Sequence, residues 1–121
     1  LSKPNVLNAD MVKSMASKPI IFALANPTPE IMPDVAISAG AYVVATGRSD
    51  FPNQINNSLV FPGAFKAMLD KQIPQFENKI FIKVAEALAD MVENPTPERI
   101  IPSMFDAGVK DTVYNAVSSL K

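Results

Sequence analysis

Two apolar runs of strand length constrain the fold of this chain more than any other feature. Residues 20–24 read Ile-Ile-Phe-Ala-Leu, and residues 41–46 read Ala-Tyr-Val-Val-Ala-Thr. Hydrophobicity that is continuous rather than alternating predicts strands buried on both faces, as in a parallel sheet covered by helices. The two runs therefore predict an α/β fold.

A helix is expected between these strands, over residues 30–39. With it, residues 20–46 form a βαβ unit with short loops. The residues that favour this helix are Ile31, Val35 and Ala39 at helical spacing, Gly40 at its end, and Asn26 or Thr28 as a cap with Pro29 and Glu30 in the first turn.

The rest of the chain is predicted to be helical and loop-like. Asn8 can cap the first helix, in which Met11, Val12 and Met15 share a core-facing side. Asn56 or Asn57 can cap the helix that follows the second strand, although Pro62 and Gly63 should disturb its early turns. The predicted helices cover residues 8–16, 58–69, 78–93 and 108–120.

Two strands are too few for a sheet that is buried on both faces, because such a pair leaves its edges exposed. We therefore expect further strands outside this chain, before Leu1. The chain is interpreted as the C-terminal part of a larger doubly wound parallel sheet, followed by C-terminal helices.

The composition excludes several classes of function. The 121 residues carry 11 basic and 12 acidic side chains, without a basic cluster, so neither nucleic acid nor an anionic membrane is an expected partner. Cys and His are both absent, which removes disulfides, thiolate chemistry, hydrolytic triads and His-based zinc sites. No apolar run approaches the roughly 20 residues of a membrane span. The expected location is the cytoplasm.

A loop rich in side-chain amides follows the second strand. It begins at Gly47, includes Asn53, Gln54, Asn56 and Asn57, and leads to Gly63. Ligands of parallel α/β sheets bind beyond the carboxyl ends of the strands, where Asn26 and Gly47 are expected to open onto one crevice. Amides both donate and accept hydrogen bonds, which suits a small ligand with carboxylate and hydroxyl oxygens. The alternative is a capped turn that only leads into a helix.

Three segments of the chain resemble the malic enzymes, in the bacterial or archaeal form of their nucleotide-binding domain. They are residues 21–30 (IFALANPTPE), residues 47–57 (GRSDFPNQINN) and residues 59–63 (LVFPG). The resemblance implies that residues 1–121 are the C-terminal portion of a Rossmann-like NAD(P)-binding domain, with the βαβ unit at about 20–46, a ligand loop at 47–57 and helices over 58–121.

The resemblance also implies an activity, namely oxidative decarboxylation of (S)-malate to pyruvate and CO2. NAD or NADP takes the hydride, and Mg2+ or Mn2+ assists as a Lewis acid. A homodimer or larger oligomer is expected. The family's proton-transferring Lys and Tyr, its metal-binding carboxylates and its Gly-rich fingerprint are expected upstream of Leu1. No catalytic or metal-binding residue is therefore assigned in this chain, which alone should be inactive.

The site residues that the resemblance implies are amides and one glycine. Asn26 and one of Asn56 and Asn57 would contact malate, with Asn57 preferred. Asn26 also lies near the nicotinamide, and Gly47 can let the backbone approach the cofactor.

Each assignment has a plain structural alternative. Asn26 could form an Asx-turn or a cap, Gly47 could be only a turn, and one of Asn56 and Asn57 could be a helix cap. Arg48 and Asp50 are interpreted as a local ion pair. For the whole chain, the alternative is a non-catalytic small-ligand-binding or interaction module derived from a Rossmann half-domain.

Overall fold

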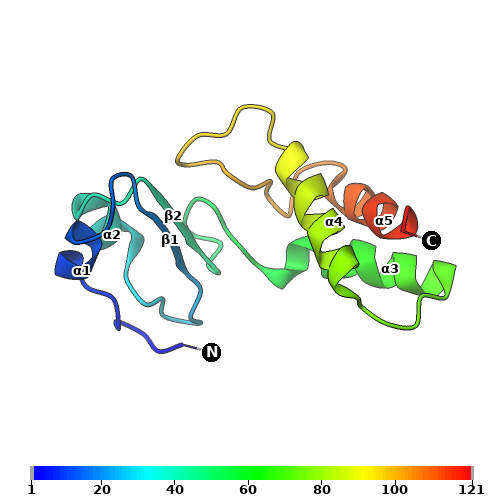
Figure 1. Ribbon diagram of the computed structural model, residues 1–121, viewed down its shortest axis with the longest axis horizontal. Helices are drawn as coiled ribbons and strands as arrows, with labels where there is room; N and C mark the ends of the chain where they lie inside the picture. Colours follow the sequence, from blue (N-terminus) through cyan, green and yellow to red (C-terminus); the bar gives the residue numbers. More distant parts are fainter. Residues whose placement is uncertain (1, 121) are drawn as a thin grey trace. The chain divides into compact units, whose positions relative to one another are not determined.

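The computed structural model describes residues 2–120, which fall into two compact units (Figure 1). The first unit extends to Asn56 and includes Pro95–Ile100, and the second contains Asn57–Asn94 with the described residues from Ile101 onward. None of the helices in the described part of the chain is long and apolar enough to cross a membrane.

The first unit contains the predicted parallel strand pair, which is confirmed. Strand β1 (Ile20–Ala23) lies beside β2 (Val43–Thr46), with Ile20 opposite Val43 and Ala23 opposite Thr46. The helix α2 (Pro33–Ser38) connects them, as expected for a βαβ unit. The α/β prediction therefore holds.

The two strands differ in burial. All four residues of β2 are buried. In β1 only Ile21 and Ala23 enter the core shared with the helices, while Ile20 and Phe22 are 64% and 53% exposed. The prediction of burial on both faces was therefore right for β2 and wrong for β1, because no described element covers the second face of β1.

Helix α1 (Ala9–Lys13) begins where the sequence predicts. The Asn8 Oδ1 accepts a hydrogen bond from the Met11 N–H at 3.0 Å, which confirms the cap. Only Val12 is buried, however, and Met11 and Met15 are exposed. The prediction that both methionines fill the core was wrong, because this short helix buries a single residue against its neighbours.

Helix α2 starts three residues later than predicted. The carbonyl of Pro29 accepts from the Asn5 N–H at 3.2 Å, and that of Glu30 accepts from the Leu7 N–H at 3.1 Å. These carbonyls therefore accept hydrogen bonds from the N-terminal segment instead of forming the first hydrogen bonds of a helix. Met32 is the cap residue and makes no side-chain cap bond, so the expected cap by Asn26 or Thr28 was wrong.

The buried face of α2 differs from the predicted one at Val35. Ala36 is fully buried, whereas Val35, which was predicted to face the core, is 43% exposed. The end of the helix is as predicted, because Gly40 follows the last turn with φ of 107°, a conformation that favours glycine.

The second unit is helical. A short 3₁₀ helix, η1 (Asn57–Leu59), precedes α3 (Phe61–Lys71), and the chain continues through α4 (Asn78–Asp90) and α5 (Val109–Ser118). Figure 1 shows these helices packed together. Their shared core consists of Leu59, Ala64, Ala67, Ile80, Val84, Leu88, Val109, Val113, Ala116 and Val117.

The start of α3 differs from the prediction. Val60 occupies the cap position without a side-chain bond, so neither Asn56 nor Asn57 caps this helix. Pro62 lies in the first turn, where a missing N–H costs nothing, and it does not disturb the helix. The helix begins later because Asn57 already belongs to η1. The carbonyl of Asn57 accepts a hydrogen bond from the Val60 N–H at 3.0 Å.

Gly63 allows α3 and α5 to approach closely. A Cβ atom at this position would lie 2.9 Å from the Val113 Cβ and 3.1 Å from the Tyr114 nitrogen, and still closer to the Lys110 carbonyl oxygen. These neighbours are rigid, so the contact requires a residue without a side chain.

Candidate functional site

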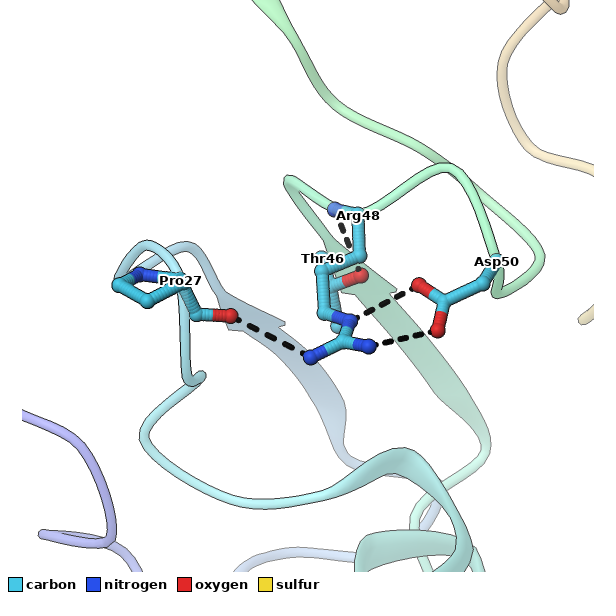
Figure 2. A network of polar contacts seen from close by, with 4 residues as sticks. All are labelled: Pro27, Thr46, Arg48 and Asp50. Atoms are coloured by element: carbon cyan, nitrogen blue, oxygen red, sulfur yellow. Dashed lines mark hydrogen bonds and ion pairs between the residues drawn. The ribbon is translucent and has the colours of Figure 1, made fainter.

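The carboxyl ends of β1 and β2 lie at one edge of the sheet. Since Ala23 and Thr46 are partners in the register, the turn that contains Asn26 and the loop that begins at Gly47 leave the sheet side by side. One hydrogen bond joins them directly, from the Arg48 Nη1 to the Pro27 carbonyl at 3.4 Å (Figure 2). This is the edge at which the sequence analysis expected a ligand.

Asn26 is exposed in the turn after β1. Its side-chain amide makes no hydrogen bond with any other residue of the described chain, so the Asx-turn and cap alternatives find no support. The peptide bond between Asn26 and Pro27 is cis. The amide is therefore accessible to a ligand.

A glutamate holds the start of this turn. The Glu30 Oε2 accepts a hydrogen bond from the Ala25 N–H at 3.0 Å. Partial burial raises the pKa of Glu30, but the hydrogen bond from Ala25 and others outweigh it, so that the pKa is lowered overall. Glu30 was predicted to lie in the first turn of a helix, and its bond to Ala25 was not predicted, since that bond depends on the path of the chain after β1.

The backbone conformation of Gly47 does not require a glycine. Its φ is outside the left-handed region, and a Cβ would make only ordinary contacts, at 3.8 Å from the Ile55 carbonyl oxygen and 4.0 Å from that of Leu24. Nothing within the described chain therefore demands a glycine here, so both the turn and the approach of a cofactor stay open as interpretations.

Two amides of the loop are directed at the backbone of Gly47. The Gln54 Nε2 and the Asn56 Nδ2 donate to the Gly47 carbonyl at 3.3 and 3.4 Å. The Ile55 N–H also donates to the Thr46 carbonyl at 2.8 Å. The loop thus folds back along the end of β2, and Asn56 serves to hold it there.

Asn53 anchors the loop, a role that the sequence analysis did not foresee. Its side chain is 7% exposed, and its Nδ2 donates to the Val44 and Pro97 carbonyls at 3.2 and 2.8 Å. Its Oδ1 accepts from the Ile100 N–H at 2.9 Å. Its φ is 56°, in the left-handed region that Asn tolerates better than most residues. That tolerance was the only local signal.

Asn57 is exposed at the start of η1 and belongs to the second unit, whereas Asn26, Gly47 and Asn56 belong to the first. The first unit brings Gly47 and Asn56 into contact and places the turn of Asn26 at the same edge of the sheet.

Arg48 and Asp50 form the predicted ion pair. The Nε donates to Oδ1 at 2.8 Å and the Nη2 donates to Oδ2 at 2.6 Å (Figure 2). The guanidinium also lies 5.4 Å from the centre of the Phe51 ring. The hydrogen bonds from Arg48 lower the pKa of Asp50, and those to Asp50 raise the pKa of Arg48. Both groups therefore remain charged near neutral pH.

The donor set at this edge is amides and backbone groups. Among residues 2–120 no group of three or more Asp, Glu, His or Cys side chains could hold a metal ion. The described residues at this edge therefore offer amide and backbone hydrogen-bonding groups, and no carboxylate cluster of the kind that holds a metal ion.

Comparison with known proteins gives one consistent result. The family model of the malic enzyme NAD-binding domain matches residues 2–115. The bifunctional malic/malolactic enzyme of Bacillus subtilis is 48% identical over 120 residues, and an NADP-dependent malic enzyme of Rhizobium meliloti is 48% identical over 101 residues. The crystal structure of an NAD-dependent malic enzyme from Thermotoga maritima matches with a TM-score of 0.91 and 50% identity.

These alignments cover most of this chain but a minor part of its relatives. They include 98%, 83% and 97% of this chain, respectively. They include 29% and 13% of the two enzymes and 30% of the crystallised chain.

Proposed function

Since this chain belongs to the malic enzyme family, as part of its NAD-binding domain, we propose that it works within an enzyme for the oxidative decarboxylation of (S)-malate to pyruvate and CO2. The observation that carries the proposal is the accessible amide of Asn26 in the turn that follows the carboxyl end of a parallel strand pair.

In this proposal Asn26 contacts malate. An amide can donate to a carboxylate or hydroxyl oxygen without adding a full charge, which leaves the electrostatics to groups supplied elsewhere. Asn57 is the preferred second malate contact, because it is exposed, whereas Asn56 is engaged with the Gly47 carbonyl.

The cofactor, NAD or NADP, supplies the acceptor of the hydride when it is bound. Asn26 and Gly47 are the residues that would lie against its nicotinamide end, and the absence of a side chain at Gly47 leaves room for it. The ligands of Mg2+ or Mn2+ and the groups that move protons are assigned to the rest of the enzyme, so this chain orients substrate and cofactor only.

The same proposal includes the partners of the chain. They are the remaining part of the enzyme, which assembles as a homodimer or larger oligomer, and the expected location is the cytoplasm. The minor share of the relatives that the chain covers supports a need for additional segments.

The proposal can be tested with a chimera in which residues 1–121 replace the aligned segment of the Bacillus subtilis enzyme. Malate-dependent formation of reduced nicotinamide is expected. Asn26→Ala should lower kcat/KM for malate by about ten- to a hundredfold, the value of a hydrogen bond to a charged group. Asn115→Ala, which removes an exposed amide from α5, is the matched control.

Two results would contradict the proposal. An inactive chimera that folds and assembles would favour the non-catalytic module. An Asn26→Ala variant with normal malate kinetics but a lower unfolding midpoint would assign Asn26 a purely structural role.

A further inference from the structure

Arg48 connects the two turns of the candidate site. Its Nη1 donates to the Pro27 carbonyl, across 21 positions of the sequence, while its other nitrogens are held by Asp50 (Figure 2). The backbone N–H of Arg48 donates to the Oγ1 of the buried Thr46 at 3.2 Å. Arg48 is thus fixed at its backbone by the end of β2 and reaches with its head group to the turn after β1.

This arrangement contributes little to stability. The side chains of Arg48 and Asp50 are 37% and 54% exposed, and ion pairs that are exposed to solvent add little to the free energy of unfolding. The pair also joins residues that are only two positions apart. The contact with Pro27 is the one that links separate segments of the chain.

We propose that Arg48 is a positioning residue for malate that acts through Asn26, an inference that rests on the proposed function. Pro27 follows Asn26 directly, so a fixed Pro27 carbonyl restricts the backbone that carries the Asn26 amide. Asp50 and the Phe51 ring hold the guanidinium in place before any ligand binds. The result is a defined position of Asn26 relative to the end of β2.

The geometry needs arginine rather than any cation. The planar guanidinium offers several donors in fixed directions, which can serve the Asp50 carboxylate and the Pro27 carbonyl at once. A lysine ammonium is a point charge on a flexible stem and cannot hold both partners in the same way. Arg48→Lys therefore separates positioning from a simple attraction of the malate anion.

A double-mutant cycle in the Bacillus subtilis chimera tests the inference. Arg48→Met is expected to lower kcat/KM for malate about tenfold, the scale of a small misplacement of a substrate-binding group. In the Asn26→Ala background the same substitution should change kcat/KM less than about twofold, because residues that act as one unit are not additive. Arg48→Lys should resemble Arg48→Met.

Lys66→Met is the matched control. Lys66 and Asp70 form an ion pair of the same length, 2.6 Å, that is also exposed, and Lys66 lies 5.4 Å from the centre of the Tyr114 ring. This variant should leave malate kinetics unchanged. Thermal unfolding of all variants should show similar midpoints. If Arg48 had a merely structural role, its variants would instead unfold at a lower temperature.

The outcomes separate this inference from the proposed function. An inactive chimera, or an Asn26→Ala variant with normal kinetics, contradicts the proposed function itself. If Asn26→Ala is impaired while Arg48→Met is normal, or if their effects are additive, the positioning role is wrong. Rescue by Arg48→Lys would also overturn it and indicate direct attraction of the malate carboxylates.

Discussion

At the scale of single residues, the amides of the loop have separate tasks. Asn53 is buried and satisfied by three backbone groups, Asn56 is held by the Gly47 carbonyl, and Asn57 is exposed. Identical side chains in one short run therefore serve as an anchor, a brace and an accessible group. What distinguishes them is the backbone that each one meets.

The anchor leads to a prediction about stability. Asn53→Ala removes the hydrogen bonds to Val44, Pro97 and Ile100 and places an alanine at φ of 56°. The free energy of unfolding should fall by about 2–4 kcal/mol, since buried partners lose their bonds and a left-handed alanine costs about 1–2 kcal/mol. Urea unfolding of the 121-residue chain measures this loss.

Asn53→Gly separates the two causes. Glycine tolerates the positive φ, so this variant should lose only the contribution of the hydrogen bonds. A loss for Asn53→Ala no larger than that for the exposed Asn115→Ala would show that Asn53 is not an anchor.

Glu30 leads to a prediction about pH. Its pKa is lowered in the folded chain, so its contribution to stability is fully present above its ordinary value of 4.5 and is lost as the pH falls through the folded value. Glu30→Gln should therefore be less stable than the unchanged chain near neutral pH, by less than about 1 kcal/mol for a partly exposed group.

The difference should disappear in acid. Unfolding midpoints of both chains, measured from pH 7 to about pH 3, would follow it. A difference that stays constant over this range would mean that the Glu30 carboxylate does not act through its charge.

At the scale of elements, hydrogen bonds between segments set where the helices begin. Helix α2 starts at Pro33 because the carbonyls of Pro29 and Glu30 accept from the N-terminal segment. Helix α3 starts at Phe61 because Asn57 opens the 3₁₀ helix η1. In both cases a proline lies at one of the first two positions of the helix, where its missing N–H is tolerated.

The contact between α3 and α5 leads to a prediction at this scale. Gly63→Ala places a methyl group against the Val113 Cβ and the backbone of α5, so the two helices must separate. We expect the free energy of unfolding to fall by about 1–3 kcal/mol, as for other overpacked interiors. Urea unfolding measures it, and Asn115→Ala on the exposed side of α5 is the control. An unchanged or higher stability would contradict the close approach.

At the scale of the whole molecule, strand β1 exposes apolar side chains on one face. Ile20 and Phe22 are exposed on a strand with one edge that no described residue pairs. Exposed apolar strands at a sheet edge are prone to pair with other chains. In the alignment with the crystallised malic enzyme from Thermotoga maritima, this chain covers 30% of the length of that protein.

We therefore expect the isolated 121-residue chain to self-associate. Ile20→Lys should reduce the associated fraction in sedimentation velocity experiments, because a charge on an edge strand opposes pairing. Ile82→Lys is the control, since Ile82 is exposed to a similar extent, 61%, on α4. Equal effects of the two substitutions would assign the association to general hydrophobicity instead of β1.

The sequence by itself determined the parallel strand pair, the edge of the sheet where the amide loop begins, the ion pair of Arg48 and Asp50, and the family. These features depend on local patterns, namely apolar runs, charges two positions apart and contiguous motifs. The cap and burial pattern of α2, the anchoring role of Asn53 and the reach of Arg48 to Pro27 were decided only by the tertiary structure. Each depends on hydrogen bonds between segments far apart in the chain, up to 47 positions in the case of Asn53 and Ile100, and no local pattern specifies such a partner.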